Sequence, residues 1–224
     1  SGRITRGNSG QGVEGVTIAF GGKFGTATIG PDGKWSKGGL NGTVTVTPAR
    51  DGWVFSPGNT QVSGAATDVN FIGGSSGGAI LDDLRLEAVV RKAVSRPTGS
   101  IPMGDAAAIA VLEAADCGIR RLDGIQYLTG LEELDLYRNQ IQDITPLSHL
   151  SKLKLLSLHG NQVSSIAGLS ALTALEEPYL DVNKIVDISP LAGLTNLKVL
   201  AFFENQVADI APVAGLTNST VLGM

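Results

Sequence analysis

The amino-acid sequence predicts a multidomain protein: an all-β sandwich, followed by an α/β solenoid of 22-residue repeats that begins with a helical cap. Three observations predict this arrangement. Of the 30 glycines, 20 lie within residues 1–78. Short β-rich segments alternate with turn sequences in the same region. From about residue 109 onward, an apolar pattern recurs with a period of 22 residues.

Charge changes at the same place as composition. Residues 1–73 carry 6 Lys and Arg against 4 Asp and Glu, whereas the remainder carries 11 against 17. Residues 73–79 are rich in Gly and Ser, which is typical of a flexible linker. The sequence therefore predicts a sandwich over residues 1–72, a linker over 73–79 and a repeat-containing domain over 80–224. Two domains joined only by such a linker are expected to unfold independently.

The N-terminal domain shows the pattern of short, half-buried strands. Val44 and Val46 alternate with threonines at period two, and Pro31-Asp32-Gly33 is a tight-turn sequence. The predicted strands cover residues 3–5, 13–20, 24–29, 42–47, 53–55 and 67–72. Several short strands at this spacing favour a β-sandwich.

Five stretches of the N-terminal region, at residues 1–5, 12–20, 30–48, 52–57 and 67–71, resemble a known domain. GVEGVTIAF at 12–20 and GPDGKWSKGGLNGTVTVTP at 30–48 are similar to the carboxypeptidase-regulatory-like, prealbumin-type (Ig-like) sandwich of bacterial secreted proteins. The resemblance covers residues 1–72 and implies a spacer or accessory module. We interpret Trp35 and Trp53 as core residues, because large aromatic side chains usually bury most of their area. The alternative for this pair is a sugar-stacking platform.

The second half of the chain is a repeat array. Six apolar columns and one asparagine column recur every 22 residues, and the asparagines are Asn139, Asn161, Asn183 and Asn205. A degenerate first unit precedes the four full repeats, with Cys117 in the asparagine column, and a truncated strand ends the range 109–224. Because one repeat cannot bury its own leucines, the repeats must stack and share a continuous core.

The repeat motifs carry a second resemblance. NQIQDITPL, NKIVDISPLAGLTNL and NQVADIAPVAGLTN closely resemble the leucine-rich repeats of internalin-type bacterial proteins. Residues 80–108 look like the helical N-terminal cap of that family: Leu86 and Val90 lie on one helical face, and Pro97 ends the helix. Such a cap shields the apolar end of the first repeat. The resemblance covers residues 80–224 and implies the fold, without naming a ligand.

One position departs from the repeat. Pro178 stands where the neighbouring repeats place an inward-pointing leucine. Proline removes a backbone donor from an internal strand and underfills the core. The sequence therefore predicts a weak point in this repeat.

Composition excludes several classes of function. The net charge of −4 and the lack of basic clusters argue against nucleic-acid binding. No apolar segment is long enough for insertion into a membrane. With only Cys117, His149 and His159 available, we expect no disulfide, no metal site and no cofactor. A triad of Asp135, Ser157 and His159 would lack an oxyanion hole and a closed pocket, so we do not expect an enzyme.

In the predicted solenoid, the side chains between the inward leucines lie on the concave face. Exposed aromatic side chains among acidic residues on a rigid sheet are typical of a protein interface. The predicted partner-binding residues are Glu133, Asp135, Tyr137, His159, Glu177, Tyr179, Asp181 and Phe203.

These observations predict a secreted or cell-surface bacterial protein that acts in adhesion or recognition. It binds a protein partner through the concave face, with the sandwich as a spacer; a surface protein of a host or neighbouring cell is one candidate partner. Two alternatives remain open. The chain is a non-catalytic accessory region of a larger secreted carbohydrate-active enzyme, with a glycan-binding sandwich, or it is a structural cell-surface protein.

Overall fold

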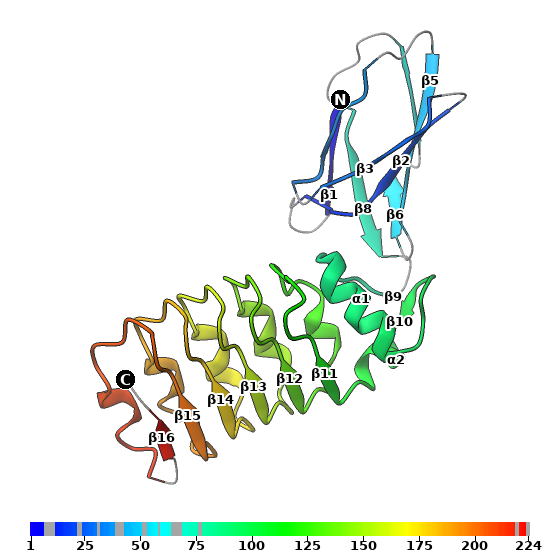
Figure 1. Ribbon diagram of the computed structural model, residues 1–224. Helices are drawn as coiled ribbons and strands as arrows, with labels where there is room; N and C mark the ends of the chain where they lie inside the picture. Colours follow the sequence, from blue (N-terminus) through cyan, green and yellow to red (C-terminus); the bar gives the residue numbers. More distant parts are fainter. Residues whose placement is uncertain are drawn as a thin grey trace.

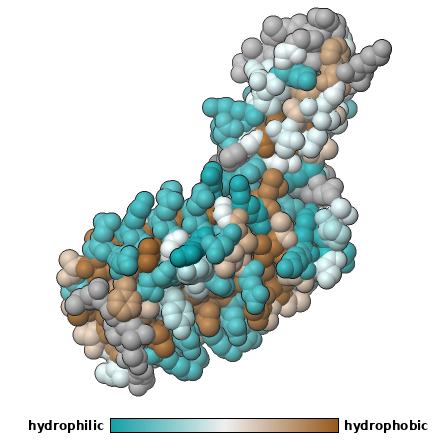
Figure 2. Space-filling model, in the orientation of Figure 1, coloured by the Kyte–Doolittle hydropathy of each residue, from teal (hydrophilic) through white to brown (hydrophobic). Residues whose placement is uncertain are grey.

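The computed structural model shows two parts: an N-terminal unit of two β-sheets, and an elongated array whose parallel strands lie side by side (Figure 1). The structure describes residues 1–6, 12–21, 24–30, 32–38, 43–50, 53–57, 59–63, 69–75, 78–217 and 220–222. Hydrophobic bands interrupt a mostly hydrophilic surface along the array (Figure 2).

The N-terminal unit contains two four-stranded sheets, ordered β4-β1-β8-β6 and β3-β2-β5-β7. Its strands are β1 (Gly2–Arg6), β2 (Thr17–Phe20), β3 (Thr26–Thr28), β4 (Lys34–Trp35), β5 (Thr43–Ala49), β6 (Trp53–Ser56), β7 (Thr60–Ser63) and β8 (Phe71–Ser75). All neighbours pair antiparallel except β1 and β8. The strands β4 and β7 were not predicted from the sequence, because both are short edge strands with few apolar residues.

One apolar core lies within this unit. Ile4, Ile18, Val46 and Phe71 are fully buried, and they come from strands of both sheets. In β5, buried and more exposed residues alternate along the strand, as the period-two pattern predicted.

The array begins with helices and a small antiparallel pair of strands. These elements are β9 (Gly78–Ala79), α1 (Leu84–Ala93), β10 (Ile101–Pro102) and α2 (Met103–Ala107). Asp83 caps α1 by accepting a hydrogen bond from the backbone N–H of Arg85 at 2.9 Å. Leu86 and Val90 of α1 are buried in the same core as Leu112 of the first array strand. The helix therefore covers the end of the array that lies toward the N-terminal unit (Figure 1).

Six parallel strands follow in chain order, each joined to the next through a 3₁₀ helix. The strands are β11 (Val111–Glu113), β12 (Glu133–Asp135), β13 (Leu155–Ser157), β14 (Glu177–Tyr179), β15 (Val199–Ala201) and β16 (Thr220–Leu222). The 3₁₀ helices are η1 (Ile125–Tyr127), η2 (Thr145–His149), η3 (Ala167–Ala171), η4 (Ser189–Leu191) and η5 (Ala211–Val213). The repeated leucines and isoleucines form one continuous buried core between strands and 3₁₀ helices.

The asparagine column connects consecutive repeats. Asn161 Oδ1 accepts a hydrogen bond from the backbone N–H of Ile141 at 3.1 Å. Its Nδ2 donates to the carbonyl oxygens of Leu136 and Leu158, both at 2.9 Å. The other three asparagines repeat this pattern. Each side chain thus satisfies backbone groups of two repeats at the point where the strand ends. Cys117, in the first position of this column, donates only to the carbonyl of Ala115 at 3.2 Å.

Pro178 is buried opposite Leu156 of the preceding strand. Between β14 and β15 the register is reduced to the single pair of Tyr179 and Ala201, whereas β12 and β13 share three pairs. The shortened ladder follows from the proline, because its nitrogen carries no hydrogen to donate.

Direct contacts join the two parts. Arg50 of the N-terminal unit has a side chain that is only 4% exposed. It donates to the carbonyl oxygen of Leu81 at 2.6 Å and forms an ion pair with Glu87 of α1. Its guanidinium also lies over the ring of Trp53, with Cζ 4.9 Å from the centroid. Ile80, although it precedes α1, is buried in the N-terminal core.

These contacts correct the expectation of two domains joined only by a flexible linker. Within residues 73–79, Gly73–Ser75 are part of β8, and Gly78–Ala79 form β9; the two residues between them lie outside the described ranges. A second ion pair, between Glu14 and Arg121, adds to the junction at 3.6 Å. The prediction was wrong because a Gly/Ser-rich composition indicates flexibility only where the backbone groups are left unpaired.

The asparagine column yields a first prediction. Asn161→Asp keeps the acceptor oxygen but removes the two N–H donors and places a carboxylate against two buried carbonyls. We expect a loss of about 3 kcal/mol in the free energy of unfolding of the array, measured by urea denaturation. Asn196→Asp is the matched control, because Asn196 is exposed and donates only to Thr173. Equal effects of the two substitutions would contradict the structural role of the column.

Pro178→Leu is predicted to stabilise the protein by about 2–4 kcal/mol. Leucine fills the inward position as in the neighbouring repeats and returns a backbone N–H to the sheet. Chemical denaturation of the variant beside the wild type measures the change. A loss of stability would mean that the surrounding backbone has adapted to proline.

The junction predicts coupled unfolding of the two parts. We expect one calorimetric transition in the wild type, and two transitions in Arg50→Met, with a loss of about 2 kcal/mol of coupling. Glu87 keeps its pairing with Arg91 at 2.8 Å in this variant, so no buried charge is stranded. Arg96→Met, which breaks the exposed pair with Asp105, should leave the single transition intact. Two separate transitions in the wild type would refute the coupling.

Candidate interaction face

The parallel register aligns the outward side chains of the array in columns. Leu112, Leu134 and Leu156 of successive strands are opposite one another and buried, so the residues that flank them point to the other side of the sheet. We call these outward residues the strand face. Its columns are residues 111, 133, 155, 177 and 199; residues 113, 135, 157, 179 and 201; and residues 115, 137, 159, 181 and 203.

One column forms a continuous chain of contacts across four repeats. The rings of Tyr137 and His159 stack, with centroids 5.0 Å apart and planes inclined by 23°. His159 Nδ1 lies 3.7 Å from Asp181 Oδ2, and Asp181 Oδ1 accepts the backbone N–H of Phe203 at 2.7 Å. Arg138 borders the column, with its Cζ 5.1 Å from the Tyr137 centroid. Phe203 ends it with 44% of its surface exposed.

The neighbouring polar side chains are also held in place. Tyr179 donates its hydroxyl to Glu177 Oε2 at 3.0 Å. This hydrogen bond to a carboxylate, together with partial burial, raises the pKa of Tyr179. Asp135 Oδ1 accepts the backbone N–H of Tyr137 at 2.9 Å. Fixed side chains of this kind lose little conformational freedom when a partner binds.

The eight residues predicted from the sequence therefore share one face, but the structure brings them together unevenly. Tyr137, His159, Asp181 and Phe203 are in one group of contacts, and Glu177 and Tyr179 are in another. Asp135 contacts only the backbone beside the first group, and Glu133 is exposed without an ion pair to any described residue. Arg138 and Val182 were not among the predicted residues, and they lie one column beyond the face.

Val182 borders the face in an unusual backbone conformation. The residue just before each position of the asparagine column has a positive φ. These residues are Asp116, Arg138, Gly160, Val182 and Glu204. Val182 is the only β-branched residue of these five. Its φ of 55° is strained, because a β-branched side chain conflicts sterically with a left-handed backbone. The 22-residue period of the sequence locates these five residues, but their positive φ angles are known only from the structure.

The polar contacts of His159 test the catalytic triad considered from the sequence. His159 makes its polar contact with Asp181 rather than with Ser157 or Asp135, so the triad considered from sequence is not assembled. Within the described ranges, no group of three or more His, Cys, Asp or Glu side chains is placed to hold a metal ion. Across the same residues, no helix has the length and apolar character needed to cross a bilayer.

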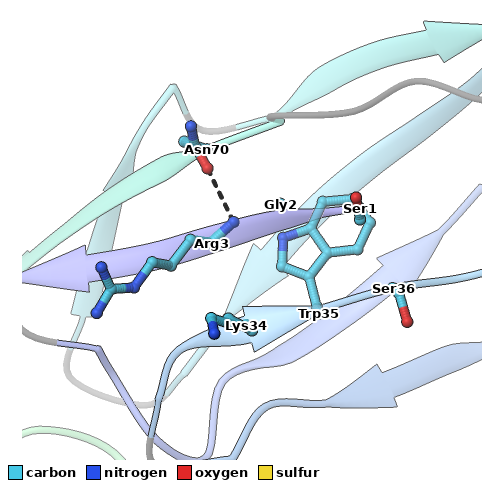
Figure 3. A pocket seen from close by; sticks show the side chains of 7 residues that line it. All are labelled: Ser1, Gly2, Arg3, Lys34, Trp35, Ser36 and Asn70. Carbon is cyan, nitrogen blue, oxygen red and sulfur yellow. Dashed lines mark hydrogen bonds between the residues drawn. The ribbon is translucent and has the colours of Figure 1, made fainter.

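The two tryptophans offer little ring surface for sugar stacking. Trp35 is 7% exposed and packs on Phe20, with centroids 5.8 Å apart; Trp53 is 9% exposed and lies beneath Arg50. An open groove of about 640 Å³ runs beside Trp35 (Figure 3). Its lining residues are Ser1, Gly2, Arg3, Lys34, Trp35, Ser36 and Asn70. The backbone N–H of Arg3 donates to Asn70 Oδ1 at 2.9 Å across it.

Comparisons with solved structures place this architecture among known folds. The chain is similar to an internalin, InlF, from Listeria monocytogenes, with 36% identity and a TM-score of 0.62 over 64% of this chain and 43% of that one. It shares the fold of the functional domain of InlJ from Listeria monocytogenes, with 22% identity and a TM-score of 0.51 over 62% of this chain and 35% of that one. No protein-family model and no curated protein matches the chain.

These similarities support an internalin-type leucine-rich repeat fold for the array, an α/β solenoid of mixed strands and helices. The chain spans less than half the length of either structure. The InlJ domain is described as including a cysteine ladder.

Val182→Gly is predicted to raise the free energy of unfolding by about 1 kcal/mol, because glycine adopts a positive φ without steric conflict. Val186→Gly is the control: Val186 is 56% exposed and is not in the positive-φ column, so its replacement should destabilise. Urea denaturation of both variants measures the two changes in the free energy of unfolding. A loss for Val182→Gly as large as that for Val186→Gly would show that the strain is negligible.

Proposed function

We propose that this chain is the recognition region of a secreted or cell-surface bacterial protein, and that it binds a protein partner through the strand face. The N-terminal unit, as a prealbumin-type Ig-like sandwich over residues 1–72, serves as a spacer. The helices within residues 80–108 serve as the cap of the repeats. The strand face is the concave face of the solenoid, and residues 109–224 supply it.

The observation that carries the proposal is the preorganised aromatic column. Tyr137 and His159 are stacked, and Phe203 is exposed in the same column, two strands beyond His159. Aromatic anchors of this kind dominate protein interfaces, because they bury large areas with few rotatable bonds. The face offers fifteen positions, fewer than the about 20–30 residues of a standard interface. We therefore expect weak binding from this chain alone.

The test is capture of a partner from cell-surface protein extracts, followed by measurement of its affinity for variants. The face variant replaces Tyr137, His159, Tyr179 and Phe203 with alanine. Each anchor is expected to contribute about 2 kcal/mol or more where it is fully buried in the complex. The matched control replaces the exposed Lys152 and Lys184, which are off the face, and should bind like the wild type.

The outcomes separate this proposal from its alternatives. A partner that ignores all four aromatic substitutions but is lost on changes to the N-terminal unit would refute it. A glycan array with the same chain tests the accessory-region alternative, which requires sugar binding that depends on Trp35 or Trp53. The burial of both tryptophans gives that alternative little support.

A further inference from the structure

The charge on the strand face has one sign. Its fifteen positions, all within the described residues, contain five carboxylates and no lysine or arginine. The carboxylates are Glu113, Glu133, Asp135, Glu177 and Asp181. Arg138, at the border, is directed over the ring of Tyr137.

The adjacent column of the same sheet is built differently. Glu132 pairs with Lys154 at 2.6 Å, and Glu176 pairs with Lys198. The hydrogen bond and charge of Glu132 raise the pKa of Lys154. This column neutralises itself in pairs, although it lies only one residue from the face along each strand. Lys154 also interacts electrostatically with Glu133 of the face, whereas no cationic side chain of a described residue pairs with Glu113 or Asp135.

Two carboxylates of this face are adjacent in the free protein. Glu113 and Asp135 are directly opposite in the register of β11 and β12. Like charges in that position destabilise a sheet, and a single glutamine would remove the effect. Neither Glu113 nor Glu133 forms an ion pair with any residue in the described ranges. A bound cation would relieve this repulsion.

Apolar side chains occupy the other end of the face. Phe203 and the partly exposed Val199 come from the last full repeat, where Ala201 is buried, and Val182 borders them with 36% of its surface exposed. The two carboxylates nearest to them are already engaged: Glu177 by Tyr179, and Asp181 by His159 and the Phe203 backbone. The carboxylates over β11 and β12 make no hydrogen bond or ion pair with the side chain of another described residue, and the apolar surface lies over β15.

We infer that the partner presents a cationic segment with an apolar end. Lysine or arginine side chains of the partner lie over Glu113, Glu133 and Asp135. An aromatic or aliphatic side chain lies over β15, about 15 Å away, which is three strand spacings. This inference rests on the proposed function, because it describes the partner of the same face. Charge complementarity of this kind steers association and fixes the orientation of the partner.

The test uses the full chain and a library of short random peptides displayed on phage. We expect the enriched peptides to carry lysine or arginine together with an aromatic or aliphatic residue. Their affinity should fall about tenfold in the double variant Glu113→Gln/Glu133→Gln, and their salt dependence should weaken. The matched control, Glu132→Gln/Glu176→Gln, removes the same charge from the neighbouring column and should change affinity less than about twofold. The thermal midpoint of the face variant should not fall, which excludes unfolding as the cause.

Two results would overturn the inference. One is a selection that enriches no cationic sequence, and the other is a set of cationic peptides that bind both double variants equally. If neutral or acidic peptides are enriched and still require Tyr179 and Phe203, the partner chemistry is wrong while the proposed function stands. If no enriched peptide depends on any residue of the face, both fail.

Discussion

In every repeat the chain must turn out of the sheet at the same point, and the hydrogen bonds of the asparagine column stabilise this turn. Where a strand ends, its backbone N–H and C=O groups turn away from the ladder while they are still buried. The side chain of Asn161 supplies one acceptor and two donors there, and it connects the repeats before and after it. Leucine could fill the volume, but it would leave these groups unpaired. The alignment of the strand face follows, because fixed strand ends keep the columns in register.

The contacts between the N-terminal unit and α1 fix the first end of the array to that unit. Arg50 is buried between the two parts and satisfies a backbone carbonyl and a carboxylate of the array at once. Ile80 extends the N-terminal core toward α1. An N-terminal unit held in this way fixes orientation as well as distance, so the direction in which the strand face points depends on the packing at the junction. We regard this as a consequence of packing at α1 rather than of the glycine-rich segment between the parts.

The sequence was most informative where one physical requirement repeats. The 22-residue period predicted the strands β12–β15 and the positions of all eight candidate residues, because stacked repeats must bury the same columns. It did not predict β4 and β7, whose edge positions require little apolar character. It also missed the junction, since the pairing of Arg50 with Glu87 joins residues that no local pattern relates. The positive φ of Val182 could not be predicted, because valine is a residue type that disfavours this backbone conformation.

The central claim is that recognition occurs on the strand face, and a steric block tests it most directly. Ser157 lies at the middle of the face and Ser164 is exposed away from it, so Ser157→Trp and Ser164→Trp introduce the same bulk at two places. The measurement is the Kd of the captured partner for each variant, with folding checked by circular dichroism. We expect affinity to fall about a hundredfold for Ser157→Trp and almost not at all for Ser164→Trp. Equal affinities of the two variants, or a loss confined to Ser164→Trp, would contradict it.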